Sequence, residues 1–596
     1  MKNILLTLAC TLFFQSAFTQ QITDKMTPYN YEKAWQEAKD FENKGLPESA
    51  LKVVNTIYEQ AKKEQYAAQL VKAVVHQLKY TDYKEENAFV KNLNKLRDEA
   101  QTATFPTKPL LHSMLGEVYW QYYQNNRYRF SERTELANIK QDDIETWGLN
   151  KIIEETFQQY KLSLENAAQS KATAINLYDE VLHTGNELGR SYRTTLYDFL
   201  AHRALDFSSG EEASITTPAY AFVLDKPEYL AEAAVFANFK IESRDTLSMK
   251  YFAIHLLQDL IQFHLPDANP EGLVELDIQR LSFVKQNLIL PDKDEVYRKA
   301  LEQLENKFIA QPVSTRVTFL IAQTYVEQAN LYKPLQSENH KWDNKKAFEI
   351  CETAKKRFPD SDGAIQCENL QIDILSKSIS ATMEENNLPG TVFRSLVHYK
   401  NFSDLHYRII KTNRDEIRSQ RKKWERNYDV DPEQKFIEYF VSQTPVKSGK
   451  YVLPDDKDYQ QHSIEVKLDA LPAGEYMVLF SHRADFVTTT NGLAYAFTRI
   501  TNISHVHRTI KDGSTEVYVL HRLSGEPLAG VTADVYSNKY NNKKQQYEVV
   551  KMGSFTSDAK GYFKVPFIKN DYTRNFSITF RLRDDQFSTE PLDSYE

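Results

Sequence analysis

Two histidines in the C-terminal third have the spacing of a metal-binding pair. His505 and His507 alternate along a predicted strand, so both side chains lie on one face and each could offer a ring nitrogen to a metal. No nearby carboxylate or cysteine run completes a ligand set of the kind that zinc requires. The sequence therefore predicts two exposed strand histidines and no metal site.

Two cysteines, Cys351 and Cys367, lie in consecutive predicted helices. These helices read KKAFEICETAKKRF and GAIQCENLQIDILSK, and the turn FPDSDG separates them. A helical hairpin can bring such positions close enough to bond, and exported proteins mature in oxidising surroundings. The pattern predicts a structural disulfide between the two cysteines, and the alternative is a pair of buried free thiols. The Cys-x-x-Cys spacing of a redox motif is missing from the sequence.

Motifs for catalysis are missing from all 596 residues. The sequence has no HExxH zinc motif, no GxSxG nucleophile elbow and no glycine-rich phosphate-binding loop. A net charge of −8 disfavours non-specific binding to nucleic acid. We therefore expect a protein that is not an enzyme, uses no cofactor and binds no nucleic acid.

Residues 1–20 have the pattern of a secretory signal peptide. A basic residue precedes an apolar stretch, and a small-residue cleavage site follows around Ala17–Thr19. Cys10 is poorly placed for lipidation because the apolar run before it is too short. No other apolar run approaches the roughly 20 residues that a membrane-spanning helix needs. We expect export to the periplasm, the outer-membrane surface or the medium, and no transmembrane segment after removal of the signal.

Residues 21–385 are predicted to be helical. Trp35, Ala38 and Phe41 follow a spacing of three to four, and a second apolar run follows a break whose Pro47 suits a helix start. Small residues at helix-crossing points and an aromatic-Pro pair at a helix end resemble tetratricopeptide-type repeats, but the period is irregular. We expect a divergent α-solenoid whose surface either binds partners or serves as a rigid spacer.

After residues 386–390 the apolar period changes from helical to alternating. Strand candidates are VFRSLVHYK, DLHYRIIK, HSIEVKL, GEYMVLFSH, LAYAFTRITNI, TEVYVLHR, GVTADVYS, YEVVKMGSF, YFKVPF and FSITFRLR, with Gly-containing turns between many of them. Short strands between such turns are typical of antiparallel β-sandwiches. We expect a first β-sandwich over 386–490 and a second over 491–596, whose completeness stays open.

The first predicted sandwich contains a helical insertion rich in Arg and Lys, which reads RDEIRSQRKKWERNYDVDPEQKFIEYF. A nucleic-acid or lipid surface is one interpretation. Glu and Asp alternate with the basic residues, however, as they do on a solvated helix face. We therefore expect the solvated face.

Three β segments carry a family resemblance: LPAGEY at 471–476, YVLHRLSGEPLAGVTADVYS at 518–537 and TSDAKGYFKVPF at 556–567. In the second segment we expect a tight reversal and a strand that returns beside the first, and in the third a β-hairpin with Gly561 at its turn. Together they resemble the first macroglobulin domains of bacterial alpha-2-macroglobulin-like proteins. The helical segments 194–207 and 355–370 look like the helical preface of large secreted members from Bacteroidetes-type bacteria.

The resemblance implies a secreted, non-catalytic inhibitor of endopeptidases, with peptidases as its partners. Family members trap peptidases after cleavage of a bait segment, and many use a thioester between the Cys and Gln of a Cys-x-Glu-Gln motif. Neither Cys351 nor Cys367 lies in such a motif, and no bait segment can be assigned. Family members are much longer, so the chain resembles their N-terminal portion as a fragment. The alternative is a cell-envelope ligand-binding or scaffold protein whose helical surface binds protein or glycan partners.

Overall fold

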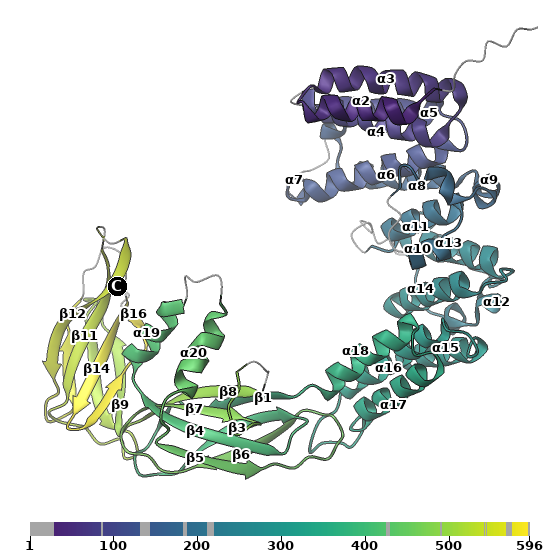
Figure 1. Ribbon diagram of the computed structural model, residues 1–596. Helices are drawn as coiled ribbons and strands as arrows, with labels where there is room; N and C mark the ends of the chain where they lie inside the picture. The colour runs from purple at the N-terminus through teal and green to yellow at the C-terminus, as the bar shows by residue number, and fades with distance from the viewer. Residues whose placement is uncertain are drawn as a thin grey trace, which may run out of the picture. The chain divides into compact units, whose positions relative to one another are not determined.

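The computed structural model shows a helical region followed by antiparallel β-sheets, as predicted (Figure 1). It describes residues 29–84, 88–131, 143–182, 187–210, 220–424, 430–488, 492–541, 543, 545–567 and 575–593. The predicted signal peptide lies outside these residues. The chain divides into two compact units, Met1–Phe308 and Ile309–Glu596. The division falls within the helical region, so the last three helices belong with the sheets.

The first unit is built from helices that pack on their neighbours in sequence. The helices are α2 (Tyr31–Asn43), α3 (Pro47–Glu64), α4 (Ala67–Lys84), α5 (Ala88–Thr102), α6 (Thr107–Asn125), α7 (Arg127–Ser131), α8 (Leu149–Leu164), α9 (Ala167–Ala172), α10 (Glu187–Tyr192), α11 (Leu196–Ser208), α12 (Ala233–Phe236), α13 (Met249–His264), α14 (Glu271–Asn287) and α15 (Lys293–Lys307). Helix α2 packs on α3, α3 on α4, α13 on α14 and α14 on α15. This order of packing is that of an α-solenoid.

The start of α3 shows how local sequence produces this unit. Pro47 is its first residue, where the missing N–H is an unpaired helix donor in any case. Ala50, Val54, Ile57 and Ala61 recur at helical spacing and are all fully buried. The predicted apolar face is therefore the face that packs.

In the second unit, α16 (Ser314–Ala329), α17 (Asp343–Arg357) and α18 (Asp362–Leu375) form a compact group. The predicted hairpin at the FPDSDG turn is confirmed, since it joins α17 to α18. Gly363 shows why a small residue is needed there: a Cβ on it would lie 2.1 Å from the carbonyl carbon of Thr315 on α16. Only glycine permits this close approach of the two helices.

The first β-sandwich consists of two sheets. Its strands are β1 (Ser378–Met383), β2 (Asn386–Asn387), β3 (Phe393–Lys400), β4 (Asp404–Thr412), β5 (Lys447–Val452), β6 (His462–Leu468), β7 (Gly474–Ser481) and β8 (Leu493–Ile500). One sheet has the order β1-β3-β6, and the other has the order β2-β8-β7-β4-β5. All their pairs are antiparallel except the short β2–β8 pair. Phe393, Val397, Val466, Val478 and Phe480 belong to the core between the sheets.

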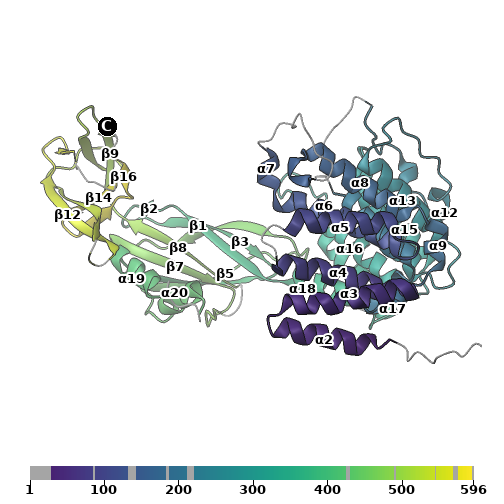
Figure 2. The same cartoon turned by 90° about the horizontal axis from the view of Figure 1, so that it is seen from above.

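The predicted helical insertion forms two helices, α19 (Arg414–Trp424) and α20 (Pro432–Val441), beside the five-stranded sheet (Figures 1 and 2). Helix α20 buries Phe436 and Phe440 against Met477 and Leu479 on the outer face of that sheet. The basic helix α19 has no buried residue, in line with the predicted solvated face, whereas α20 is a packing element.

The second β-sandwich follows directly. Its strands are β9 (Ile503–Thr509), β10 (Thr515–His521), β11 (Thr532–Asn541), β12 (Gln546–Thr556), β13 (Tyr562–Val565), β14 (Asn575–Leu582), β15 (Asp585–Ser588) and β16 (Leu592–Asp593). One sheet has the order β13-β10-β9, and the other has the order β12-β11-β14-β15, with β16 also paired to β14. Val517, Val519, Ala533, Ile578 and Phe580 fill the core between them.

Both predicted boundaries of the sandwiches differ from the structure. The first sandwich begins at Ser378 rather than at 386, because β1 pairs with β3. It ends at Ile500 rather than at 490, because β8 pairs with β7 along its whole length. Local alternation marks a strand but does not show which sheet the strand joins.

Two predicted strand pairings in the second sandwich were wrong. The segment after β10 returns beside it only through a bridge between Leu520 and Pro527, and β11 then joins the opposite sheet. The Gly561 turn likewise connects strands of different sheets, β12 and β13, instead of closing a paired hairpin. Gly561 does occupy the left-handed region, with φ +71°. Both turns are therefore crossings between sheets.

Candidate functional site

The predicted strand histidines lie on β9 but in different surroundings. Their rings stack with centroids 5.5 Å apart. His507 is exposed as predicted, whereas His505 is half-buried against Phe580 and Phe587. Burial lowers the pKa of His505 to about 4, so this ring is neutral at neutral pH. Among the described residues, no group of three or more His, Cys, Asp or Glu side chains is placed to hold a metal ion.

Cys351 on α17 and Cys367 on α18 are both fully buried and face each other. They are free thiols in the structure. The hydrogen bond to the Cys367 thiol, together with burial, raises the pKa of Cys351. A disulfide between them stays a prediction, and mass spectrometry of the unreduced secreted protein would test it.

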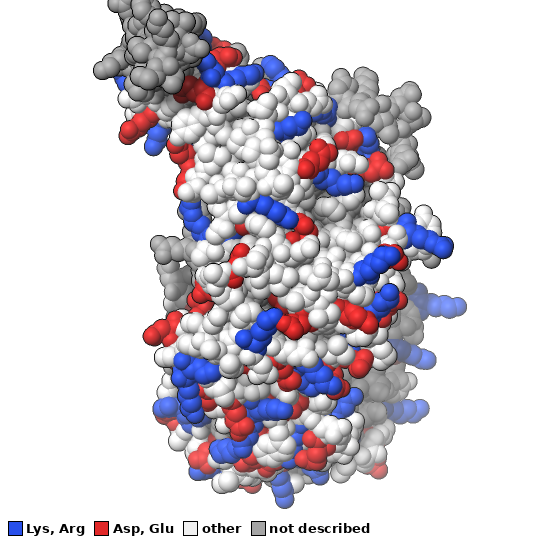
Figure 3. All heavy atoms as spheres, turned by 90° about the vertical axis from the view of Figure 1, so that its right-hand side faces the viewer, with Lys and Arg blue, Asp and Glu red and all other residues white. Residues whose placement is uncertain are grey.

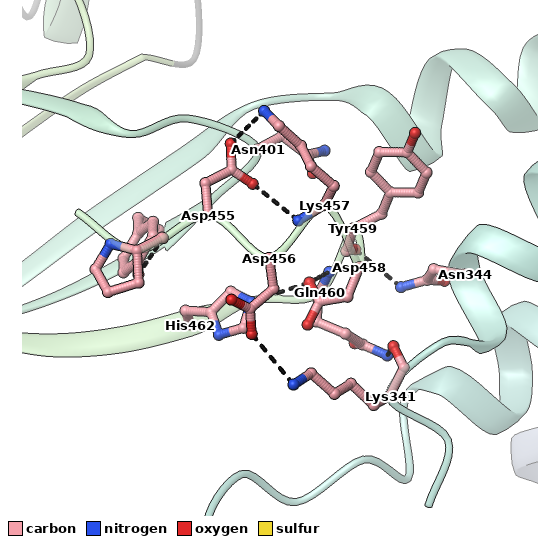
Figure 4. Close-up of polar contacts among 12 residues, drawn as sticks. Lys341, Asn344, Asn401, Asp455, Asp456, Lys457, Asp458, Tyr459, Gln460 and His462 are labelled. Atoms are coloured by element: carbon pink, nitrogen blue, oxygen red, sulfur yellow. Dashed lines mark hydrogen bonds and ion pairs between the residues drawn. The ribbon is translucent and has the colours of Figure 1, made fainter. Parts of the chain in front are cut away.

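The loop between β5 and β6 attaches helices α16 and α17 to the first sandwich (Figure 4). The buried Gln460 donates from Nε2 to the carbonyl oxygens of His340 and Lys341, at 3.0 and 3.3 Å. Asn344 Nδ2 donates to the carbonyl oxygen of Tyr459 at 3.0 Å. Loss of either amide would remove these hydrogen bonds between the helices and the loop of the sandwich.

The carboxylates of this loop hold its shape and add a charge contact. We call the contact between this loop and the α16–α17 segment the junction. Asp456 pairs with Lys341 across it at 3.1 Å. The buried Asp458 accepts hydrogen bonds from the main chain of Gln460 and from His462 Nε2, both at 3.0 Å. Burial by itself would raise the pKa of Asp455, but hydrogen bonds from Lys457 lower it below its ordinary value. The arrangement fixes helices to a sheet, and its chemistry is structural.

A second attachment lies at the turn between β3 and β4. Asn401, in the left-handed region with φ 62°, donates from Nδ2 to the carbonyl oxygens of Ile374 and Ser376 at 2.8 and 2.9 Å. These carbonyls lie at the end of α18, where helix carbonyl groups have no partner within the helix. The helical group of the second unit is thus held to the first sandwich at two places.

Polar contacts also join the two sandwiches. Glu590, after β15, pairs with Arg499 of β8 at 2.9 Å and with Arg414 of α19 at 3.4 Å. The main chain of Asn502 donates to Asp585 Oδ2 at 2.7 Å. Exposed ion pairs contribute about 0.2–1 kcal/mol each, so their role is to orient the sandwiches.

The first unit contains a cleft of about 520 Å³ lined by aromatic and polar side chains of α2 and α4, together with Tyr66 and Glu180 from outside these helices. The lining residues are Tyr31, Glu32, Trp35, Gln36, Lys39, Tyr66, Gln69, Lys72 and Glu180. Trp35 Nε1 donates to Gln69 Oε1 at 2.6 Å, and the Lys72 ammonium lies 4.7 Å from the centre of the Trp35 ring. The rings of Tyr31 and Tyr66 meet edge to face at 5.5 Å. Hydrogen bonds thus hold aromatic rings in place at the surface of a cleft.

Charge on the helical face shown in Figure 3 is mixed. Basic and acidic side chains lie interspersed there, with uncharged stretches between them. A face of this kind lacks the single-sign patch that steers polyanions. In the described part of the chain, no helix is both long enough and apolar enough to cross a membrane.

Sequence reasoning did not single out the junction residues. The signal for them is the run Asp455-Asp456-Lys457-Asp458 between two strands, followed by Gln460. Such a run reads as a solvated turn, because its partners are more than 100 residues away in sequence. The aromatic cleft was equally hidden, since Trp35 also has the spacing of a helix-packing residue.

Solved structures give partial likenesses to this chain. No family model matches the chain, and no curated protein matches it. A solved structure of Salmonella alpha-2-macroglobulin reacted with methylamine is similar over 36% of this chain and 16% of its own, with 9% sequence identity and a TM-score of 0.17. The match covers a minor part of both chains, and the function of this chain is therefore a proposal.

Proposed function

We propose that the chain is the N-terminal portion of a secreted, alpha-2-macroglobulin-like inhibitor of endopeptidases, in which it acts without catalysis. The observation that carries the proposal is the attachment of successive parts in the second unit, by hydrogen bonds between the helical group and the first sandwich and by weaker, exposed ion pairs between the two sandwiches. A helical group is bonded to a first β-sandwich through Gln460 and Asn344, and that sandwich is bonded to a second through Glu590. The sequence motifs of the sandwiches resemble macroglobulin domains.

A non-catalytic inhibitor of this class needs rigid attachment between domains, because it must hold a large partner. Buried hydrogen bonds to main-chain carbonyls supply such attachment, since each has a fixed direction and a high cost of loss. The proposed role of the helical region is to position these sandwiches in the envelope or to dock partners. Export would place the molecule where foreign peptidases act.

The test uses the whole secreted product of the native gene, incubated with serine, cysteine and metallo-endopeptidases. We expect a stable complex with at least one of them, slower cleavage of azocasein, and unchanged cleavage of a short chromogenic peptide that can still reach the active site. The variant Gln460→Ala should weaken the protection of azocasein. Its matched control is Gln461→Ala, since the neighbouring Gln461 is exposed. A product that forms no complex and protects no large substrate would contradict the proposal.

A second candidate function, glycan binding by a cell-envelope protein, is favoured by the aromatic cleft of α2 and α4. Aromatic rings at a cleft surface offer apolar faces to sugar rings, and the Gln and Glu side chains beside them can accept or donate hydrogen bonds to hydroxyl groups.

Titration of the chain with bacterial and host oligosaccharides, followed by tryptophan fluorescence and calorimetry, tests this candidate. Trp35→Ala should weaken binding about tenfold, because it removes the largest ring of the cleft. Trp342→Ala is the matched control. Trp342 is 46% exposed, precedes α17 in the second unit and does not line the cleft. Equal binding by both variants would exclude the cleft as the glycan site.

A further inference from the structure

A second cleft of the first unit, of about 340 Å³, is lined by α5, α6 and α8. Both α5 and α8 pack on α6, and side chains three or four positions apart share one face of a helix. The lining residues are Arg97 and Gln101 of α5, His112 and Leu115 of α6, Glu155, Gln159 and Leu162 of α8, and Trp147, which precedes α8. Ligand pockets measure about 300–1,000 Å³, so a cleft of this size suits a small ligand.

Arg97 is a cation that has no carboxylate partner among the described residues. It donates from Nε and Nη2 to the hydroxyl oxygen of Tyr119 at 3.1 and 3.0 Å, and from Nη1 to Asn94 Oδ1 at 2.9 Å. Its guanidinium carbon lies 5.6 Å from the centre of the Trp147 ring. A guanidinium has five N–H groups, so one N–H on each Nη atom is left without a partner. The side chain is thus held in place with two donors to spare, the number with which arginine binds a carboxylate.

Two buried polar side chains of the lining also have unused hydrogen-bonding groups. His112 and Gln159 are only 5% and 9% exposed, and His112 Nδ1 lies 2.7 Å from Gln159 Oε1. The amide oxygen can only accept, so Nδ1 donates, and burial lowers the pKa of His112 and keeps the ring neutral. His112 Nε2 is therefore an acceptor and Gln159 Nε2 a donor, and neither has a partner in the part of the chain that the structure describes. Because buried polar groups are normally paired, these two point to a ligand in the cleft.

The charges around the cleft leave one cation unbalanced. Glu155, the one carboxylate among the described lining residues, pairs with Lys151 at 2.5 Å. Further out, Lys108 and Glu165 have opposite charges and offset each other. The remaining charge is that of Arg97, which favours a ligand with a single negative charge.

We propose that this cleft binds a small organic acid with one carboxylate, an amide group and an apolar body, of the kind of an N-acyl amino acid. The carboxylate pairs with the two free N–H groups of Arg97. The amide N–H donates to His112 Nε2, the acyl oxygen accepts from Gln159 Nε2, and the apolar body packs on Leu115 and Leu162. A free acid and the C-terminal residue of a peptide share this chemistry. The inference does not depend on the proposed inhibitor function or on the aromatic cleft of α2 and α4.

Isothermal titration calorimetry of the full chain with N-acetyl-leucine tests the site. We expect saturable binding, and N-acetyl-leucine amide, which lacks the negative charge, should bind at least about tenfold more weakly. Inorganic phosphate in its dianionic form should also bind more weakly, because the cleft offers one cation. The peptide acetyl-Ala-Ala-Ala-Leu separates the two sources of the ligand. Tighter binding than that of N-acetyl-leucine identifies a chain end, and weaker binding identifies a free acid.

Variants with matched controls locate the site. Arg97→Gln removes the cation and should weaken binding at least about tenfold. Lys91→Gln removes the same charge from an exposed position of α5 outside the lining and should leave binding unchanged. Gln159→Glu keeps an acceptor for His112 but puts a negative charge in the cleft, so it should abolish binding. Its control is Gln158→Glu at the exposed neighbouring position of α8, and thermal unfolding shows whether each variant keeps its fold.

Four results would overturn the inference. Equal binding of N-acetyl-leucine and its amide, a comparison that needs no variant, would exclude recognition of a carboxylate. Tighter binding of phosphate would make an inorganic anion the ligand. Unchanged binding by both Arg97→Gln and Gln159→Glu would place the ligand elsewhere. A lack of saturable binding by N-acetyl-leucine and by the peptide up to about 10 mM would leave water as the occupant of the cleft.

Discussion

The two β-sandwiches are built alike but differ in what covers their larger sheets. In the first, α20 packs on the outer face, so the central strand β7 is buried on both faces from Tyr476 to Ser481. In the second, the outer face carries charged side chains that form ion pairs: Asp534 of β11 pairs with Lys551 and with Arg581. The edge strand β12 is uncovered, with Tyr547 and Val549 about half exposed.

The strand sequences themselves indicate whether one or both faces of a strand are covered. A continuous apolar run such as that of β7 indicates a strand whose two faces are both covered. Alternation of polar and apolar residues indicates a strand with one solvent-exposed face. The covered sheet is expected to respond strongly to loss of apolar volume. The uncovered sheet is expected to respond to charge and pH. Hydrogen exchange, followed separately for each sandwich during urea unfolding, distinguishes the two.

The largest effect is expected from Phe440→Ala on the covered face. Phe440 is fully buried between α20 and the sheet, so its loss leaves a cavity and should lower the free energy of unfolding of the first sandwich by about 3–5 kcal/mol. Tyr547→Ala on β12 of the uncovered sheet, where Tyr547 is 53% exposed, should cost below about 1 kcal/mol. Equal losses would remove the distinction between covered and uncovered sheets.

The second effect separates two glycines with the same backbone conformation. Gly390 in the first sandwich and Gly561 in the second have φ +68° and +71°. A Cβ on Gly390 meets no atom within 4 Å, but one on Gly561 would lie 2.4 Å from the Val519 carbonyl oxygen. Gly390→Ala should therefore cost roughly 1–2 kcal/mol, and Gly561→Ala about 3 kcal/mol. The free energies of unfolding of the two variants decide the matter, and a smaller loss for Gly561→Ala would show that this crossing turn can move.

The third effect is a pH dependence of the second sandwich. Burial by itself would raise the pKa of Asp534, but hydrogen bonds from Lys551, Ser554 and Arg581 lower it to about 2. The ionised carboxylate therefore stabilises the fold fully above its ordinary pKa of about 3.9, and this contribution is lost as the pH falls toward 2. Solvent screening of the half-exposed cations leaves about 1 kcal/mol. Unfolding between pH 5 and pH 2 measures it, and Asp534→Asn should remove this component.

The smallest effect is expected on the uncovered edge. Val549→Thr on β12, where Val549 is 51% exposed, should change the free energy of unfolding by less than about 0.5 kcal/mol. Met477→Thr, the same kind of change on the covered face of β7, should cost several times more because Met477 is fully buried. A large loss for Val549→Thr in the free energy of unfolding would indicate that another surface covers β12 in solution.

Strands with a strong alternating or apolar pattern could be predicted from sequence. Segments such as those of β3, β7 and β14 were recognised because local side-chain chemistry determines them. Strand β1 was missed because Ser378–Met383 follows a helical pattern directly and falls in the stretch 21–385 that was expected to be helical. Strand β5 was not among the expected strands because Lys447–Val452 contains Ser-Gly, which is typical of a turn. The junction through Gln460 and Asn344 could not be predicted, since its partners are far apart in sequence.

The sequence by itself determined that helices precede strands, where most strands lie, that Pro47 stands at a helix start, and that the FPDSDG turn joins two helices. These features depend on local periodicity and on backbone freedom, which neighbouring residues decide. Only the tertiary structure decided that β8 completes the first sandwich, that the Gly561 turn crosses between sheets, and that Gly363 lies against α16. The physical reason is that the apolar pattern of a strand indicates which of its faces is buried. The strand that it pairs with depends on other segments of the chain, which this pattern does not describe.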